Sequence, residues 1–97
     1  MLTSKQRAYL KSIANSLDPV FQIGKGGISE EQAARIDDYL RVHEIMKVKV
    51  LENSLLTAKE AIGALAEAIS AEPVAAIGSI MILYKRNNKD PKITLPR

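Results

Sequence analysis

The sequence contains no cysteine and no tryptophan, and its aromatic residues are limited to three tyrosines and one phenylalanine. The absence of cysteine excludes disulfide bonds and thiolate metal ligands. Four aromatic residues scattered along the chain do not predict a platform of the RRM type, which stacks bases on clustered aromatic side chains. No apolar run approaches the roughly 20 residues that a helix needs to cross a bilayer, and the first residues lack the apolar core of a signal peptide. We therefore expect a single cytoplasmic domain with no membrane partner.

The sequence is also poor in groups that could perform catalysis. Its single histidine, His43, falls at an expected junction between a helix and a strand, where a surface or structural role is more common than a catalytic one. Ser29, Ser54 and Thr57 are better explained as helix caps than as nucleophiles. We therefore expect no catalytic residue, no metal site, no cofactor and no small-molecule substrate, and a protein that is not an enzyme.

The net charge of +3 is distributed unevenly along the 97 residues. Residues 1–28 carry four basic residues and one acidic residue, and residues 73–97 carry five basic residues and one acidic residue. The middle of the chain, residues 29–72, carries five basic and nine acidic residues. If the fold brings the two basic ends together, one face becomes a cationic patch suited to a polyanion. The alternative is a set of scattered, solvated charges.

The apolar pattern predicts seven elements in the order α-β-α-β-α-β-β. Each expected helix begins at a capping box, in which Ser or Thr is followed three residues later by Glu or Gln. Asp18-Pro19 and Glu72-Pro73 are expected to stop the first and third helices, and Gly78-Ser79 is typical of a hairpin turn. The expected helices are 3–17, 29–42 and 57–72, and the expected strands are 20–23, 45–51, 74–77 and 80–84.

This order predicts an α/β domain with a four-stranded mixed sheet and three helices. Strands 74–77 and 80–84 are almost entirely apolar, so we expect both in the interior of the sheet. In strand 45–51, Lys47 and Lys49 alternate with apolar residues and share one face, which is also what a solvated side would show. The domain is expected to span residues 1–86. Residues 87–97 lose all periodicity and are expected to form a polar, flexible tail.

The most informative segment is Ile23-Gly24-Lys25-Gly26-Gly27-Ile28, between an expected strand and an expected helix. Backbone N–H groups in such a turn can approach a phosphate closely because glycine has no Cβ, and Lys25 adds a cation. The spacing matches neither the P-loop nor the dinucleotide-binding fingerprint. What remains is G-x-x-G, the loop with which KH domains clamp a nucleic-acid backbone. A tight structural turn is the alternative interpretation.

Several sequence blocks, in a defined order and spacing, make the chain resemble a known family over about residues 2–86. It resembles the CRM domain (chloroplast RNA splicing and ribosome maturation) in its stand-alone bacterial, YhbY-type form. The blocks are Leu2-Thr3-Ser4-Lys5-Gln6-Arg7, Asp18-Pro19-Val20, Ile23-Gly24-Lys25-Gly26-Gly27, Lys47-Val48-Lys49-Val50, and Ile77-Gly78 followed by Leu83-Tyr84-Lys85-Arg86.

The resemblance implies a fold similar to the C-terminal domain of a bacterial translation initiation factor. It also implies RNA binding through the G-x-x-G loop, with large-subunit rRNA or pre-ribosomal particles as the partner. A second function class stays open: the acidic helices 29–42 and 57–72 would dock a basic ribosomal or assembly protein. The candidate RNA-binding residues are Gly24, Lys25, Gly26 and Gly27 in the loop, together with Lys5, Arg7, Lys11, Lys85 and Arg86.

Overall fold

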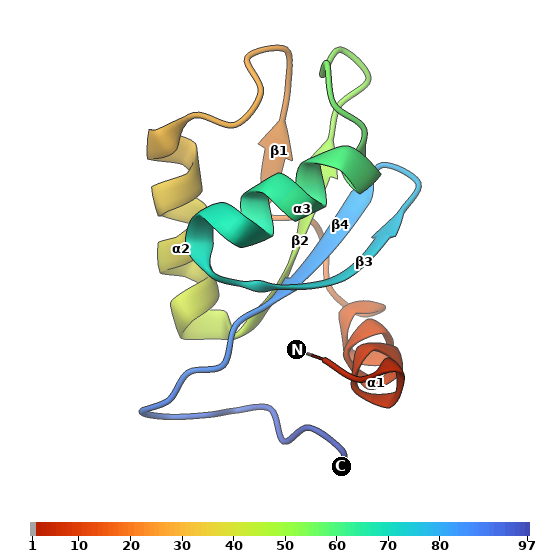
Figure 1. The fold of residues 1–97 in the computed structure, drawn as a ribbon, viewed down its shortest axis with the longest axis vertical. Coiled ribbons are helices and arrows are strands. Elements are labelled where there is room, and N and C mark those ends of the chain that lie inside the picture. The colour runs from red at the N-terminus through yellow and green to blue at the C-terminus, as the bar shows by residue number, and fades with distance from the viewer. Residues whose placement is uncertain (1) are drawn as a thin grey trace.

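The computed structural model describes residues 2–97 and has the predicted α/β architecture of three helices and a four-stranded mixed sheet (Figure 1). The order of the elements is as predicted. The predicted domain of residues 1–86 begins at Met1, which lies outside the described residues. The elements are α1 (Ser4–Ala14), β1 (Phe21–Ile23), α2 (Glu30–His43), β2 (Ile45–Val50), α3 (Ala58–Ile69), β3 (Glu72–Ile77) and β4 (Ile80–Tyr84).

The strands follow the order β1-β2-β4-β3, with β1 parallel to β2 and the other neighbours antiparallel. Strand β4 is central, as predicted. The prediction that β3 also lies in the interior is wrong: β3 is an edge strand, and only Val74 within it is buried. Pro73 gives the physical reason, because proline has no backbone N–H to donate to a second neighbouring strand.

The helices begin where their capping residues predict. The caps of α1 and α3 are complete capping boxes. At α2, the Ser29 hydroxyl accepts a hydrogen bond from the Gln32 backbone N–H at 3.0 Å, so half of the predicted box is present. The Gln32 side chain instead donates to the Gln22 carbonyl oxygen at 2.7 Å. This glutamine therefore ties the start of α2 to β1, on either side of the glycine turn.

Helices α1 and α3 both end earlier than the sequence predicts, and α1 stops at Ala14, with Asn15 as its C-cap, before Asp18-Pro19 is reached. Helix α3 stops at Ile69, because Ser70 adopts a left-handed conformation with φ 56° and donates its N–H back to Ala66 and Glu67. The chain then passes directly into β3. Glu72-Pro73, predicted to stop the helix, is therefore the beginning of the next strand.

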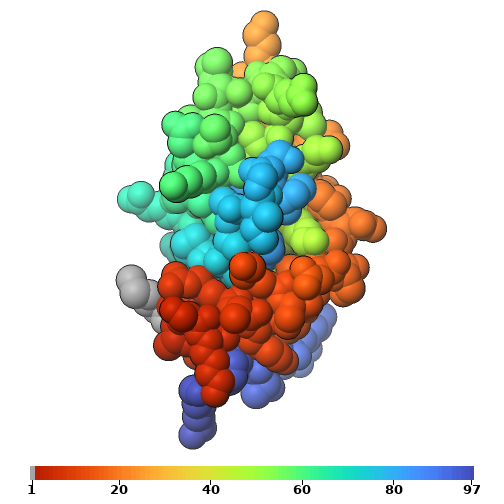
Figure 2. All heavy atoms as spheres, turned by 90° about the vertical axis from the view of Figure 1, so that its right-hand side faces the viewer, coloured from red at the N-terminus to blue at the C-terminus, as the bar shows by residue number. Residues whose placement is uncertain are grey.

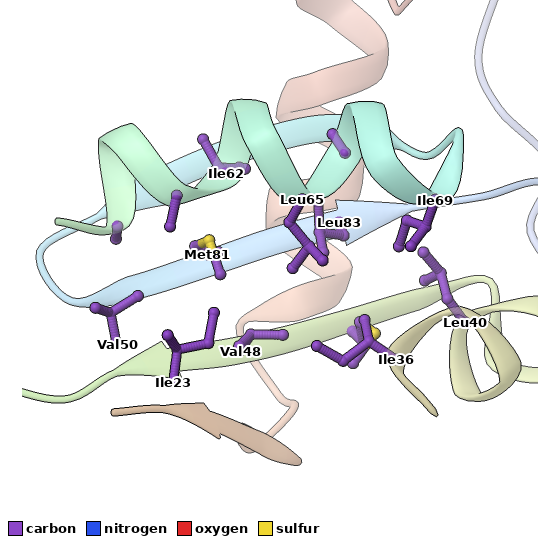
Figure 3. Close-up of a cluster of buried hydrophobic side chains, with 14 residues drawn as sticks. Ile23, Ile36, Leu40, Val48, Val50, Ile62, Leu65, Ile69, Met81 and Leu83 are labelled. Carbon is purple, nitrogen blue, oxygen red and sulfur yellow. The ribbon is translucent and has the colours of Figure 1, made fainter. Parts of the chain in front are cut away.

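The two faces of the sheet are covered unequally. Helices α2 and α3 cover one face and bury the larger apolar cluster, which includes Ile36, Leu65 and Met81 (Figure 3). Helix α1 packs on the other face through Leu10 and Ala14. A single short helix cannot cover four strands, and part of this second face stays open.

The C-terminal segment is held by a buried carboxylate. Glu44, at the end of α2, has φ 67° and is fully buried. Its carboxylate oxygens accept backbone N–H groups from Asn87 at 2.9 Å, from Lys92, and from Ile93 at 3.0 Å. The flexibility expected of residues 87–97 stays a prediction.

Candidate nucleic-acid interface

The glycine segment forms a tight turn between β1 and α2. The Gly27 N–H donates to the Gly24 carbonyl oxygen at 3.0 Å, which places Lys25 and Gly26 at the centre of the turn. Lys25 and Gly26 are exposed. The turn lies beyond the end of β1 at the upper end of the molecule in Figure 1. A cation and two consecutive backbone units are thus presented to solvent at one extremity of the fold.

The three glycines of the turn are not equivalent. Gly27 has φ +70°, a conformation that other residues adopt only with strain. A Cβ on Gly24 would make ordinary contacts of 3.6 Å with Asn53 and Leu51. A Cβ on Gly26 would meet nothing within 4 Å, and its φ is not in the left-handed region. The needs of a structural turn therefore explain Gly27 and leave Gly26 unexplained.

The backbone donors at the centre of the turn are available to a ligand. Within residues 2–97, the amide N–H groups of Lys25 and Gly26 form no hydrogen bond. Unpaired, exposed N–H groups flanked by a lysine can bind a phosphate oxygen through two donors and a positive charge. Any anion bound there would contact the turn itself. The first turn of α2 would contribute little, because its positive end already carries Glu30 and Glu31.

The basic residues of α1 lie at the other end of the molecule. The Lys5 ammonium donates to the carbonyl oxygen of Arg97 at 3.2 Å, and the Gln6 side chain donates to that of Pro96 at 3.1 Å. The two basic ends of the chain therefore meet, which was the condition for a joint cationic patch. The glycine turn does not join them, because it lies at the opposite end of the longest dimension, 38 Å (Figure 1). Arg7 and Lys11 are exposed and form no ion pair within the described chain.

Lys85 is engaged within the fold. Its ammonium lies 2.8 Å from a carboxylate oxygen of Asp37 on α2 and 2.6 Å from the carbonyl oxygen of Ile69 at the end of α3. Burial acts to raise the pKa of Asp37, but the hydrogen bonds and charges of Lys85 and Arg41 outweigh it and hold that pKa below its usual value. Lys85 thus joins β4 to both helices, and only 22% of its side chain is exposed. Arg86, the next residue, is exposed.

Two lysines outside the predicted set of site residues lie between α1 and the turn. Lys47 and Lys49 project from β2 on the face away from α2 and α3, where Lys47 is half-buried and Lys49 is exposed. Figure 2 shows the molecule from the right-hand side of Figure 1, with α1 in red below, the β3–β4 hairpin in blue above it and the turn in orange at the top. The alternation of lysine and apolar residues along β2 was the signal that could have identified both lysines as candidate site residues.

On the opposite side of the molecule, the two arginines of α2 form ion pairs. Arg41 pairs with Asp37 at 3.0 Å, and Arg35 lies 3.9 Å from Glu31, in both cases within α2. The Arg35–Glu31 pair is exposed and contributes little to stability, but it neutralises the two charges on the surface. Among the residues that the structure describes, no cluster of three or more carboxylate or imidazole side chains could hold a metal ion. Helices long and apolar enough to cross a membrane are likewise absent from residues 2–97.

Comparisons with known proteins agree with this architecture. The chain matches the model of the CRS1/YhbY (CRM) domain over residues 2–85. It is 36% identical over 96 residues to the probable RNA-binding protein YqeI of Bacillus subtilis, covering 99% of this chain and 100% of that protein. It is 38% identical over 96 residues to an RNA-binding protein of Haemophilus influenzae, covering 99% of this chain and 96% of that protein. The solution structure of SAV1595 from Staphylococcus aureus superposes with a TM-score of 0.75 at 43% identity, covering 99% and 100% of the two chains.

Proposed function

Because the chain belongs to the CRS1/YhbY (CRM) domain family, whose bacterial relatives include RNA-binding proteins, we propose that it binds RNA through the Gly24–Gly27 turn and acts in assembly of the large ribosomal subunit. The assignment to the large subunit rests on the family resemblance. The use of the turn rests on the residues of this chain.

One observation carries the proposal, namely the unexplained glycine at position 26. Its conformation tolerates a side chain, and a Cβ would point into open space. With glycine there, no side chain obstructs a ligand that approaches the unpaired N–H groups of Lys25 and Gly26 and the Lys25 ammonium. This arrangement suits a phosphate of an RNA backbone, which is how G-x-x-G loops act in KH domains.

The proposed mechanism is stoichiometric binding in which no covalent bond is made or broken. The turn clamps the backbone at one end of the molecule, and Arg7 and Lys11 supply further phosphate contacts from α1. Arg86 and Lys5 add charge near the C-terminal end. Lys85 would have to break its ion pair with Asp37 before it could contact a phosphate, so in this mechanism it stabilises the fold and does not bind RNA. Contacts of this kind position RNA without reading its bases.

A salt titration tests whether phosphate contacts dominate. With four to six contacts, the logarithm of the affinity for a structured RNA should fall linearly with the logarithm of the salt concentration, with a slope of roughly −3 to −5. Fluorescence anisotropy with a labelled rRNA hairpin between about 50 and 300 mM KCl would measure this slope. An affinity that hardly changes over this range would contradict the proposal.

The acidic helices offer a test of the protein-docking alternative. Glu67 on α3 is exposed, whereas Glu60 completes the capping box by accepting hydrogen bonds from Thr57, which lower its pKa. Glu67→Lys therefore changes surface charge without disturbing a cap, and RNA affinity should stay equal or rise slightly because repulsion decreases. Pull-downs from cell extract with parent and variant complete the test. If the variant loses a specific protein partner while RNA binding is intact, docking is the better interpretation.

A further inference from the structure

The open part of the second sheet face is organised in cross-strand rows. Gln22 of β1, Lys49 of β2, Ile80 of β4 and the exposed Ile77 of β3 are paired in register and form one row. Lys47 and Ile82 form the next row, towards α1. Residues directly opposite each other on adjacent strands share a face. Each row is therefore a continuous strip of side chains across the sheet.

Burial by α1 decreases from one row to the next. The row of Ile45 and Tyr84 is buried under α1, and in the next row Ile82 is buried while Lys47 is only half-buried. In the last row Lys49 is exposed and Ile80 is half-buried. This last row is immediately followed along β1 by Ile23 and the glycine turn. The open face is thus continuous with the turn at one edge and with α1 at the other.

The charges on this open face are uncompensated. Within residues 2–97, neither Lys47 nor Lys49 forms a hydrogen bond or an ion pair through its ammonium, in contrast to Arg35, Arg41 and Lys85 on the side of α2. Two lysines two residues apart on a strand lie about 7 Å from each other on the same face. Their mutual repulsion is unfavourable in the free protein, and a polyanion would relieve it.

We infer that the open sheet face, defined by Gln22, Lys47 and Lys49, is a second site for an RNA backbone, and this inference rests on the proposed function. The face leads the RNA strand that the turn holds towards Arg7 and Lys11 on α1. The occupant is a phosphate backbone because the part of the face formed by β1 and β2 presents amide and ammonium donors, whereas Ile80 and Ile77 lie towards the edge at β3. It carries no aromatic side chain that a base could stack on, since Tyr84 of the same face is buried under α1. RNA bound this way would lie along the 38 Å axis of the molecule.

The double variant Lys47→Gln/Lys49→Gln tests the inference. Glutamine keeps most of the side-chain length and removes both charges. For an RNA hairpin of about 16 base pairs, we expect the salt slope to fall by about two and the affinity at about 50 mM salt to fall at least tenfold. A single-stranded oligonucleotide of about four nucleotides, the length that a G-x-x-G loop clamps, should lose less than twofold because it need not reach the sheet.

The matched control is Arg35→Gln/Lys59→Gln, which removes the same net charge from the helical face. It should leave the hairpin affinity within about twofold of the parent. Equal loss in both double variants would show a general charge effect and overturn the inference, and so would an unchanged hairpin affinity in Lys47→Gln/Lys49→Gln. Lys25→Ala separates the two proposals: if it leaves both RNAs bound as tightly as before, the turn itself fails as the RNA site. Thermal unfolding checks that each variant is folded.

Discussion

Changing Lys25 and Gly26 together to aspartate is expected to abolish most RNA binding while leaving the protein folded. The change removes a cation and adds two anions at the centre of the turn, so the affinity for a structured RNA should fall by roughly a hundredfold or more at about 50 mM salt. The fold should tolerate it because Gly26 has no positive φ and its Cβ would meet nothing within 4 Å. Anisotropy titrations and co-sedimentation with large-subunit precursors would measure the loss.

Two single variants separate the effect of charge from that of the backbone. Lys25→Ala keeps every glycine and should weaken binding modestly for all RNA sequences, with the salt slope reduced by about one. Gly27→Ala keeps the charge but forces a side chain at φ +70°, which should lower the free energy of unfolding by about 1 kcal/mol. If the folded double aspartate variant still co-sediments with precursors as the parent does, the turn is only structural and the proposed function is wrong.

Among the substitutions proposed for this protein, Glu44→Ala should lower the free energy of unfolding the most. Glu44 is fully buried and accepts backbone N–H groups from Asn87, Lys92 and Ile93. Without the carboxylate these three donors must find water, which requires the C-terminal segment to leave α1 and the apolar cluster that holds Ile93 and Leu95. We expect the free energy of unfolding to decrease by about 2–4 kcal/mol, since each unsatisfied buried donor costs about 1–3 kcal/mol and the segment can partly hydrate. Urea denaturation would measure the change.

The pH dependence of stability provides an independent check on Glu44. Burial acts to raise its pKa, but the hydrogen bonds from the three backbone N–H groups and the charge of Arg86 outweigh it, so the pKa in the folded state is below the usual value. A lowered folded-state pKa contributes stability above the unfolded-state pKa, and this contribution is lost as the pH falls through the folded-state value. The stability difference between parent and Glu44→Gln should therefore shrink on acidification below about pH 4. The exposed Glu67→Gln is the control, and a difference independent of pH would contradict the assigned role.

The local order of the fold could be read from the sequence because it depends on residues close together in the chain. Capping boxes join positions three apart, and strand alternation repeats every two residues. A turn that needs a left-handed residue selects glycine, as at Gly27 and Gly78. These signals predicted all seven elements, the hairpin and the candidate loop. They failed at the end of α3, where Ser70 takes the left-handed conformation that usually marks a glycine.

Partners far apart in the sequence were decided only by the tertiary structure. Lys85 and Asp37 are 48 positions apart, and no local pattern indicates that their side chains meet. The same holds for Glu44 and the C-terminal segment, and for Lys47 and Lys49, whose place between α1 and the turn depends on how much of the sheet α1 covers. The sequence by itself determined which segments are helix, strand and turn, because neighbouring residues set backbone preference and amphipathic period. Packing determined that Lys85 meets a distant carboxylate and that Lys49 stays exposed, because only the docking of helices on the sheet brings distant charges together or leaves them uncovered.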